Sequence, residues 1–329
     1  MMPLELRRRF YAEEIEATSN LRSTAIVDAL ASVPREQFLP PGPWTIRGEA
    51  DFQSPPRQTA DADPRHVYHN LAIAIDPARQ LFNGAPGLLA MAIDTLAVVP
   101  GHRVLHVGAG TGYYTAVLAQ CAGPSGRVVA FEVDAALAEQ ARANLAAFSS
   151  VDVRHGDGSH ALDGPFDAIL VNAGMTHPLE SWLEALAVGG RMILPLTVTM
   201  TPSIGKGLLL LLTRTEDADR LDARIVTFVA IYSGVGVRDE TRGALLADAM
   251  RKNPFPQLKQ LRRDAHEASA SCWLHAQGCC LSTASVRLKT LRTSGDGRSD
   301  GCGRLRLKAD MFFVRGARLW LRCTRSVRL

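Results

Sequence analysis

A glycine-rich loop is the part of this 329-residue chain whose residue types and spacing point most directly to chemistry. The apolar run 104–107 predicts a buried strand, and the amphipathic run that begins at Tyr113 predicts a helix. Between them, Gly108, Gly110 and Gly112 leave bare backbone at the N-terminus of that helix, where a ligand can lie directly against it. The pattern is typical of a loop that binds a nucleotide-type cofactor.

The spacing of these glycines favours a nucleoside over a pyrophosphate. The dinucleotide fingerprint G-x-G-x-x-G would need glycine at position 113, where this chain has Tyr113. A phosphate-binding P-loop would need a lysine followed by Ser or Thr after the loop, and the sequence has none there. The loop is therefore neither a P-loop nor a standard dinucleotide fingerprint.

Acidic residues are predicted at the ends of the next two strands. Strand 127–131 is followed by Glu132, whose carboxylate can accept both hydroxyls of a ribose. Strand 151–154 delivers Asp157 to the same edge of the sheet, where it can accept a proton from an adenine amino group. Three strand ends thus offer bare backbone, an acceptor for the ribose hydroxyls and an acceptor for the amino group of the base. This set favours S-adenosyl-L-methionine over a nicotinamide cofactor. The residues expected to bind it are His106, Gly108, Ala109, Gly110, Gly112, Tyr113, Glu132, Val133, Asp157, Gly158 and Asn172.

The chain resembles the protein-L-isoaspartate O-methyltransferases, which are class I S-adenosylmethionine-dependent methyltransferases, in four segments that occur in the same order. These are Val-Pro-Arg-Glu-Gln-Phe-Leu-Pro at 33–40, the loop at 104–119, Arg-His-Gly-Asp-Gly at 154–158 and Gly-Pro-Phe-Asp-Ala-Ile-Leu-Val at 164–171. The resemblance implies an S-adenosyl-L-methionine-dependent O-methyltransferase that methylates a carboxylate of an isoaspartyl-containing protein or peptide.

Two positions depart from the pattern of that family. The family carries a Thr-Ile-Ser-x-Pro signature whose serine lies at the methyl-accepting carboxylate, whereas this chain has Gly84 at the position of the serine, followed by Ala85 and Pro86. His106 stands where methyltransferases usually have an acid near the methionine part of the cofactor. Gly84 gives the acceptor pocket more space and one hydroxyl fewer. This leaves open a second interpretation, a methyltransferase of the same fold that acts on a small molecule or a peptide natural product.

Four residues are candidates for the catalytic side of the site. We expect Asn83 and Gly84 to line the acceptor pocket, and Asn172, at the end of strand 166–171, to hydrogen-bond the acceptor or the cofactor. A carboxylate acceptor is already ionised at neutral pH, so positioning alone can supply most of the catalysis. A hydroxyl acceptor would instead need a general base, for which His177 is the first candidate, ahead of His69 and His106.

Alternating strands and helices predict an α/β fold, a Rossmann-like doubly wound and mostly parallel sheet with helices on both faces. Segments 207–213 and 224–231 flank a charged tip and predict an antiparallel C-terminal hairpin. The expected strands are 103–107, 127–131, 151–154, 166–171 and 191–195, and the expected helices are 4–19, 23–31, 87–97, 112–121, 135–147, 179–187 and 239–252.

The chain divides by pattern into three regions. Residues 1–236 are expected to form the methyltransferase domain, with N-terminal helices and a substrate-side loop in 1–100 and the cofactor-binding sheet in 101–236. Residues 237–282 are expected to form a C-terminal extension, and 283–329 a basic, poorly ordered tail.

Charge is distributed unevenly between these regions. The tail 283–329 carries twelve Lys and Arg residues against three acids, so the net charge of +4 for the whole chain leaves −5 for the rest. A mildly acidic body argues against a broad nucleic-acid-binding face, and a nucleic-acid-associating protein with an idle pocket is the last-ranked interpretation. With no apolar run long enough for a membrane helix and no signal peptide evident, we expect a cytoplasmic protein without membrane partners.

A group of cysteines and histidines precedes the tail. It comprises His266, Cys272, His275, Cys279 and Cys280. Their spacing matches no common zinc pattern, and adjacent cysteines are awkward for tetrahedral ligation. From the sequence we therefore expect no metal, and a packed segment of little periodicity with incidental cysteines.

Overall fold

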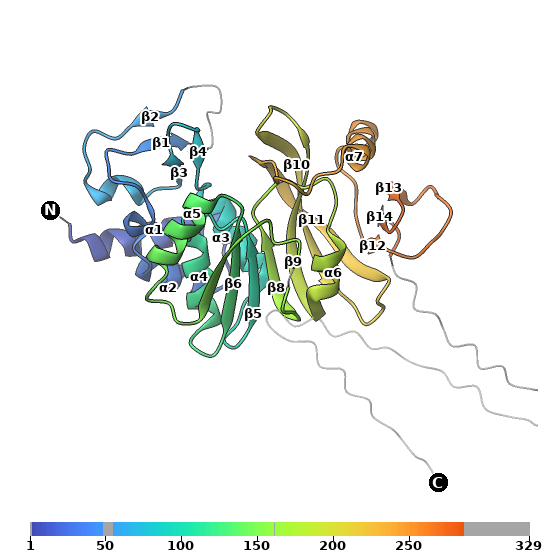
Figure 1. The fold of residues 1–329 in the computed structure, drawn as a ribbon, viewed down its shortest axis with the longest axis horizontal. Coiled ribbons are helices and arrows are strands. Elements are labelled where there is room, and N and C mark those ends of the chain that lie inside the picture. The colour runs from blue at the N-terminus through green and yellow to red at the C-terminus, as the bar shows by residue number, and fades with distance from the viewer. Residues whose placement is uncertain (1, 49–54, 161, 286–329) are drawn as a thin grey trace, which may run out of the picture. The chain divides into compact units, whose positions relative to one another are not determined.

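A ten-stranded sheet forms the centre of the computed structural model, which describes residues 2–48, 55–160 and 162–285 (Figure 1). Its strands are β5 (Arg103–Val107), β6 (Arg127–Glu132), β7 (Val151–His155), β8 (Phe166–Val171), β9 (Leu186–Thr199), β10 (Ile204–Arg214), β11 (Arg220–Tyr232), β12 (Gln260–Arg262), β13 (Cys272–Ala276) and β14 (Cys279–Ser282). They lie in the order β13-β14-β12-β11-β10-β9-β8-β5-β6-β7.

Strands β7, β6, β5, β8 and β9 run parallel, and the inner ones among them are buried on both faces. Leu105 of β5 lies opposite Val129 of β6 and Ile169 of β8. Successive side chains of β5 enter different apolar clusters, Val104 on one face of the sheet and Leu105 on the other. A parallel sheet that is buried on both faces requires helices on both faces, so the predicted doubly wound α/β architecture is confirmed.

The helices divide between the two faces according to the apolar cluster in which their buried residues lie. Five helices supply residues to the cluster around Val104, and two supply residues to the cluster around Leu105. The first set is α1 (Leu4–Ser19), α2 (Thr24–Ser32), α3 (Pro86–Leu96), α4 (Tyr113–Ala122) and α5 (Ala135–Asn144), and the second is α6 (Glu180–Ala185) and α7 (Glu240–Lys252). The helix that follows β5 and the helix that follows β8 therefore cover opposite faces of the sheet. The carboxyl ends of these two strands form the switch point, where doubly wound sheets bind ligands.

The antiparallel part of the sheet begins at β9. Leu208 of β10 lies opposite Leu196 of β9 and Phe228 of β11, which confirms the predicted hairpin. Strand β9 is longer than expected, and α6 is correspondingly shorter, ending at Ala185 instead of 187. Pairing of β9 with β8 already starts at Leu186, and this draws the chain into the sheet before the Gly189 turn.

The segment 254–282 differs from its expectation. Instead of a segment of little periodicity it contains β12, β13 and β14, which extend the main sheet by antiparallel pairing from β11 outward. Leu261, Leu274 and Leu281 of these strands are buried in the same cluster as Leu105. Each strand has only three to five residues, too few for periodicity to be visible in the sequence.

A second, four-stranded antiparallel sheet covers part of the switch point. Its strands are β1 (Thr45–Gly48), β2 (Arg57–Gln58), β3 (Leu71–Asp76) and β4 (Leu81–Phe82), in the order β2-β1-β3-β4. The sequence predicts a long loop at 40–64, and two short strands of this sheet, β1 and β2, fall within that region.

The buried guanidinium of Arg35 attaches this small sheet to the N-terminal helices. Arg35 lies in a short 3₁₀ turn, η1 (Arg35–Phe38), and is fully buried. It donates hydrogen bonds to the carbonyls of Val67, His69 and Leu71 at 2.8, 3.1 and 2.7 Å and to Asn83 Oδ1 at 3.4 Å. These four acceptors offset much of the desolvation of the charge, while Arg35 Nε has no hydrogen-bond partner among the described residues.

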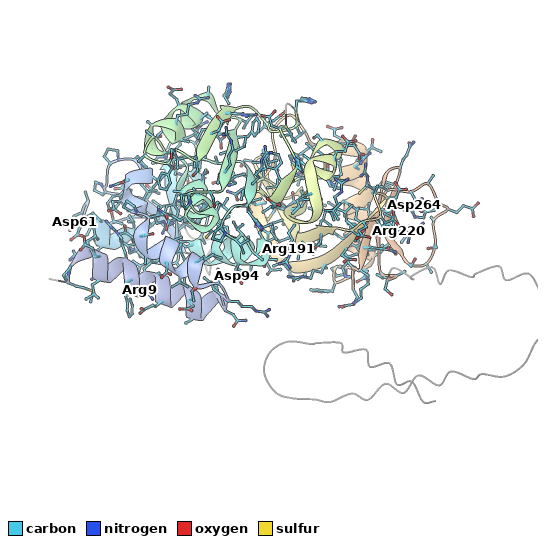
Figure 2. The ribbon with its side chains drawn as sticks, turned by 90° about the horizontal axis from the view of Figure 1, so that it is seen from below. Arg9, Asp61, Asp94, Arg191, Arg220 and Asp264 are labelled. Atoms are coloured by element: carbon cyan, nitrogen blue, oxygen red, sulfur yellow. The ribbon has the colours of Figure 1, made fainter. Side chains whose placement is uncertain are left out.

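Polar contacts of Asp94 and Arg191, which are labelled in Figure 2, also fix the helices against the main sheet. The Asp94 carboxylate accepts the backbone N–H groups of Arg22 and Ser23 at 3.2 and 2.9 Å, immediately before α2 begins. Arg191 of β9 donates to the carbonyl of Thr95 at 3.3 Å. One end of α3 is thus tied both to α2 and to the sheet.

The predicted basic tail, 283–329, lies almost entirely outside the described residues, which end at residue 285. Within them, no helix has the length and apolar character needed to cross a membrane.

Replacing Arg35 by alanine is expected to lower the free energy of unfolding by about 3 kcal/mol, because three backbone carbonyls and Asn83 lose their buried donor. Urea denaturation followed by circular dichroism measures the change. The control is Arg9→Ala on α1, an exposed arginine paired with Glu13 and Asp28 and labelled in Figure 2, which is expected to leave the free energy of unfolding nearly unchanged. Equal losses in the two variants would contradict the role given to Arg35.

Candidate cofactor and acceptor site

A cavity of about 710 Å³ lies at the carboxyl ends of the parallel strands, next to the small sheet. Segments far apart in the sequence contribute to its wall, namely the loop 108–111, the turn 132–134, residues 172–173 after β8, the strand end 81–85 and the stretch 230–235. Of the predicted site residues, the lining includes Asn83, Gly84, Gly108, Ala109, Gly110, Tyr113, Glu132, Val133 and Asn172.

The carboxylate of Glu132 is held in place by two backbone N–H groups. Oε2 accepts from Gly110 at 2.7 Å, and Oε1 accepts from Asp134 at 3.0 Å. The residue is only 7% exposed, yet it lines the cavity. Each carboxylate oxygen has a second lone pair, so the group can still accept two hydroxyl hydrogen bonds, as a ribose would require.

Gly112 determines the shape of the turn between the glycine-rich loop and α4. It caps the N-terminus of α4 with φ +97°, and a Cβ at this position would come within 2.7 Å of Leu145 Cδ1. Leu145 is itself buried and has little room to move. Gly112 does not line the cavity, so its contribution is the shape of the turn and not a direct contact.

Asp157 and Gly158 lie beside the cavity without lining it. Asp157 Oδ1 accepts the N–H and the hydroxyl of Ser159 at 2.9 and 2.6 Å. Burial opposes ionisation of Asp157, but these hydrogen bonds outweigh it and hold its pKa below the usual value. Its Oδ2 faces Gly236, where an added Cβ would lie 3.8 Å away, next to the cavity-lining stretch 230–235. The Gly158 carbonyl accepts from the indole of Trp182 at 2.7 Å, a packing role.

Asn83 lines the cavity and keeps one amide donor that the surrounding packing leaves unused. Its Oδ1 accepts from the backbone N–H of Ile73 at 3.0 Å and from Arg35, which fixes the orientation of the amide. Its Nδ2 is buried and has no hydrogen-bond partner among the described residues. Buried donors of this kind are normally paired, so a ligand that offers an oxygen here would gain a hydrogen bond.

Gly84 and Asn172 complete the expected acceptor side. Gly84 has φ +79°, and its carbonyl accepts from the hydroxyl of Tyr114 at 3.2 Å. Asn172 donates from Nδ2 to the Gly108 carbonyl at 3.3 Å, and its backbone N–H bonds the Val107 carbonyl at 2.8 Å. The side chain of Asn172 therefore joins the ends of β5 and β8 as well as facing the cavity.

The histidines proposed as possible bases lie away from the cavity. His106 is fully buried beneath α4, with Nδ1 2.9 Å from Thr115 Oγ1, because its side chain points to the helix-covered face of β5. His177 is 3.0 Å from Thr176 Oγ1, near the start of α7, and His69 is outside the lining as well. These positions do not support a contact of His106 with the cofactor or a catalytic role for His177.

Many lining residues were not anticipated from the sequence, among them Arg47, Tyr232 and Arg238. Arg47 of β1 lies over the ring of Phe82 at 5.0 Å, and its buried Nε has no partner among the described residues. Tyr232 of β11 accepts the Phe82 N–H at 3.1 Å, and Arg238 donates to the Gly174 carbonyl at 2.5 Å. No local sequence signal marks them, since each reaches the cavity through the packing of distant segments.

This combination defines the class of protein. A glycine-rich turn after the first parallel strand of a doubly wound sheet, with a carboxylate at the end of the adjacent strand, agrees with the S-adenosyl-L-methionine-dependent methyltransferases, the class to which the matching family model and relatives belong. The chain belongs to the protein-L-isoaspartate(D-aspartate) O-methyltransferase (PCMT) family, whose model matches residues 52–225. The resemblance seen in the sequence is thereby confirmed.

Individual relatives agree with this assignment. The chain is 37% identical to a protein-L-isoaspartate O-methyltransferase of Methylorubrum populi over 220 residues, which cover 66% of this chain and 90% of the relative. It is also 37% identical to one of Methylorubrum extorquens over 240 residues, 71% of this chain and 92% of the relative.

Solved structures show the same fold. One protein-L-isoaspartate O-methyltransferase structure has a TM-score of 0.57 at 24% identity and covers 74% of this chain and 69% of its own. A structure from Plasmodium falciparum, described as a putative protein-L-isoaspartate O-methyltransferase in complex with S-adenosyl-L-homocysteine, has a TM-score of 0.52 at 17% identity, with 69% and 97% covered.

Replacing Glu132 by glutamine is expected to weaken the binding of S-adenosyl-L-homocysteine about 10- to 100-fold, because charge-assisted hydrogen bonds to the ribose become neutral ones. Isothermal titration calorimetry measures the affinity. Glu139→Gln on the exposed face of α5, where Glu139 pairs only with Arg142, should leave the affinity unchanged. An unaltered affinity in the Glu132 variant would remove this carboxylate from the cofactor site.

Stability is expected to fall as the pH is lowered from about 6.5 to about 4, because burial lowers the pKa of His106 to about 4. In that interval the unfolded chain binds a proton at His106 and the folded protein does not, so unfolding is favoured by up to about 3 kcal/mol. Urea denaturation at several pH values should give a shallower pH dependence for His106→Leu than for the wild type. Identical slopes for the wild type and His106→Leu would show that the ionisation of His106 does not contribute to this pH dependence.

Proposed function

We propose that this protein transfers the methyl group of S-adenosyl-L-methionine to the carboxylate of an isoaspartyl residue in a protein or peptide. The observation that carries the proposal is the similarity to enzymes of that name along about nine-tenths of their length, combined with a cavity at the expected edge of the sheet. Glu132 and the bare backbone of 108–110 suit the nucleoside part of the cofactor.

The described residues fit this cofactor at three points. The Glu132 carboxylate is preorganised to receive ribose hydroxyls, Asp157 Oδ2 is available near the same edge for an amino group, and the loop 108–110 exposes backbone toward the cavity. When bound, the cofactor supplies an electrophilic methyl group on a sulfonium centre.

The acceptor side has the polarity that a carboxylate requires. Arg47 places a guanidinium on the cavity wall, and Asn83 Nδ2 adds a buried, unpaired N–H donor. Guanidinium and amide donors together can hold a carboxylate with one oxygen directed at the methyl group. None of the described histidines lines the cavity, and an ionised carboxylate, unlike a hydroxyl, needs no base to lose a proton.

One observation favours a second candidate, a methyltransferase of the same fold that acts on a small molecule or a peptide natural product. Gly84 stands where the family signature has serine, and its φ of +79° is a conformation that serine adopts only with strain. An added Cβ would also lie 3.0 Å from Leu89 Cδ2. The backbone of this chain is thus adapted to glycine, which is consistent with a different acceptor shape.

Incubation with labelled S-adenosyl-L-methionine and an isoaspartyl peptide is expected to give a base-labile methyl ester, and the matching aspartyl peptide should give none. Arg47→Gln is expected to raise KM for the isoaspartyl peptide about 10-fold or more, through loss of a charge-assisted contact, with KM for the cofactor unchanged. The control is Arg57→Gln, an exposed arginine of β2 that does not line the cavity.

The outcomes separate the two candidates. If the protein binds S-adenosyl-L-homocysteine but forms no ester on the isoaspartyl peptide, the isoaspartyl proposal fails and the second candidate stands. Equal effects of the Arg47 and Arg57 variants would remove Arg47 from the acceptor site.

A further inference from the structure

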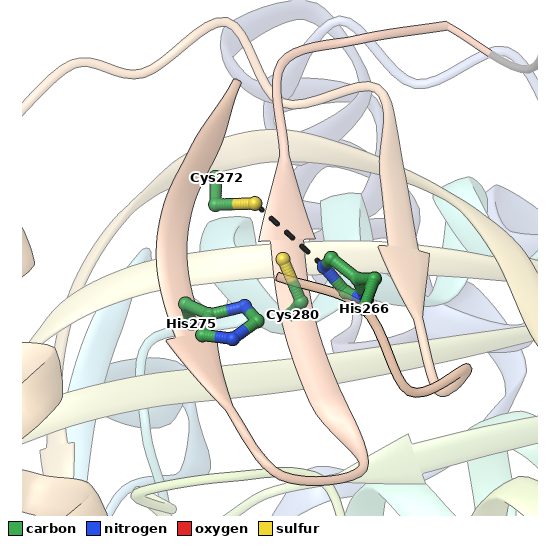
Figure 3. A group of neighbouring side chains, drawn as sticks. All are labelled: His266, Cys272, His275 and Cys280. Carbon is green, nitrogen blue, oxygen red and sulfur yellow. Dashed lines mark hydrogen bonds between the residues drawn. The ribbon is translucent and has the colours of Figure 1, made fainter. Parts of the chain in front are cut away.

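Four side chains that the methyltransferase site does not use point toward one another near the outer edge of the ten-stranded sheet (Figure 3). His266 lies in the loop after β12, Cys272 and His275 lie on β13, and Cys280 lies on β14. One potential ligand atom from each side chain falls within 4.8 Å of all the others. The sequence led us to expect incidental cysteines here, and the fold instead brings two thiols and two imidazoles together.

A β-bulge explains how Cys272 and His275 come to share a face. In a regular strand, residues three apart point to opposite faces of the sheet. The register of β13 shifts between Cys272 and Leu274, so that Cys272 lies opposite Ser282 and His275 lies opposite Cys280. Positions 280 and 282 face the same side of β14, and their partners on β13 therefore do so as well.

The adjacent cysteines of β14 serve different purposes. Strand alternation sends Cys279 into the apolar cluster beneath the sheet and Cys280 to the opposite face. Only one of the two thiols is thus offered to the cluster of His266, Cys272, His275 and Cys280. Adjacent cysteines are awkward for tetrahedral ligation only if both must bind the same ion. Here only Cys280 would bind it, because Cys279 points to the other face of the strand.

Neighbouring groups orient two of the four side chains, His266 and Cys272, as metal ligands are usually oriented. His266 Nδ1 is 2.8 Å from the Asp264 carbonyl, which can only accept, so Nδ1 carries the proton and Nε2 presents a lone pair 3.7 Å from Cys272 Sγ. Ser269 donates its backbone N–H to Cys272 Sγ at 3.4 Å. His275 Nδ1 is buried and has no hydrogen-bond partner among the described residues.

We propose that His266, Cys272, His275 and Cys280 form a structural zinc site. Two thiolates and two imidazoles are a complete tetrahedral ligand set for Zn²⁺, and with four protein ligands no coordination position is left for a substrate. Zinc bonds of about 2.0–2.3 Å place tetrahedral ligand atoms roughly 3.3–3.8 Å apart, so small rotamer changes close the present group around the ion.

The proposed ion would fasten the loop 263–271, which joins β12 to β13, to the sheet. The strands themselves are anchored by buried leucines, but this loop has only alanines as apolar residues. A metal bound to His266 in that loop and to both outer strands would hold the loop in place of apolar contacts. The site is separate from the cavity, since none of the four ligands lines it.

The test begins with the metal content of the full-length protein, purified under reducing conditions and measured by inductively coupled plasma mass spectrometry. We expect about one zinc ion per chain, falling to roughly one tenth or less in Cys280→Ser. The matched control is Cys279→Ala, which changes the neighbouring thiol on the opposite face and should retain the zinc.

A spectroscopic measurement keeps the proposal testable if a variant does not fold. Co²⁺ added to wild-type protein freed of metal by a chelator should produce intense visible bands of a tetrahedral site and thiolate charge-transfer absorption, which Zn²⁺ then abolishes. Cys279→Ala should give the same spectrum. Absence of these bands in folded wild-type protein would overturn the proposal, and so would a Cys272–Cys280 disulfide found by mass spectrometry in the freshly purified protein.

Discussion

The desolvated guanidinium of Arg35 is the interaction on which the acceptor half of the site depends. Its two terminal nitrogens donate to three carbonyls of 67–71 and to the side-chain oxygen of Asn83, which offsets much of the cost of burying the charge, while its Nε has no partner among the described residues. Together with the backbone N–H of Ile73, Arg35 also fixes the orientation of the Asn83 amide. Arg35 therefore contributes both to the packing of the N-terminal region and to the acceptor side of the cavity, although it does not itself line the cavity.

The cofactor half is organised by a different constraint, the common edge at which parallel strands end. Glu132 follows directly from β6, and its carboxylate bonds the backbone of the loop that follows β5. The two adjacent strand ends are thereby locked to each other before any ligand arrives. Such preorganisation reduces the ordering cost of binding.

The features that the sequence predicts well are local ones. The glycine loop, Glu132 and the strands around them are encoded in adjacent residues, and periodicity or spacing reveals them. Arg47 could not be found in this way, because it reaches the cavity only through pairing of β1 with β3, across more than twenty residues. His106 was misplaced because residue type does not tell which face of a doubly buried strand a side chain takes. The bulge at Cys272 is equally invisible, since it is a property of strand register.

That bulge also affects how the molecule meets other copies of itself. Among the described strands, β13 is outermost on its side of the sheet, and a flat outer strand offers free backbone groups that can template the addition of a foreign strand. A bulge interrupts the regular ladder and increases the local twist, so β13 is a poor template for such growth. The irregularity that gathers two cysteines and two histidines on one face thus doubles as a safeguard against aggregation.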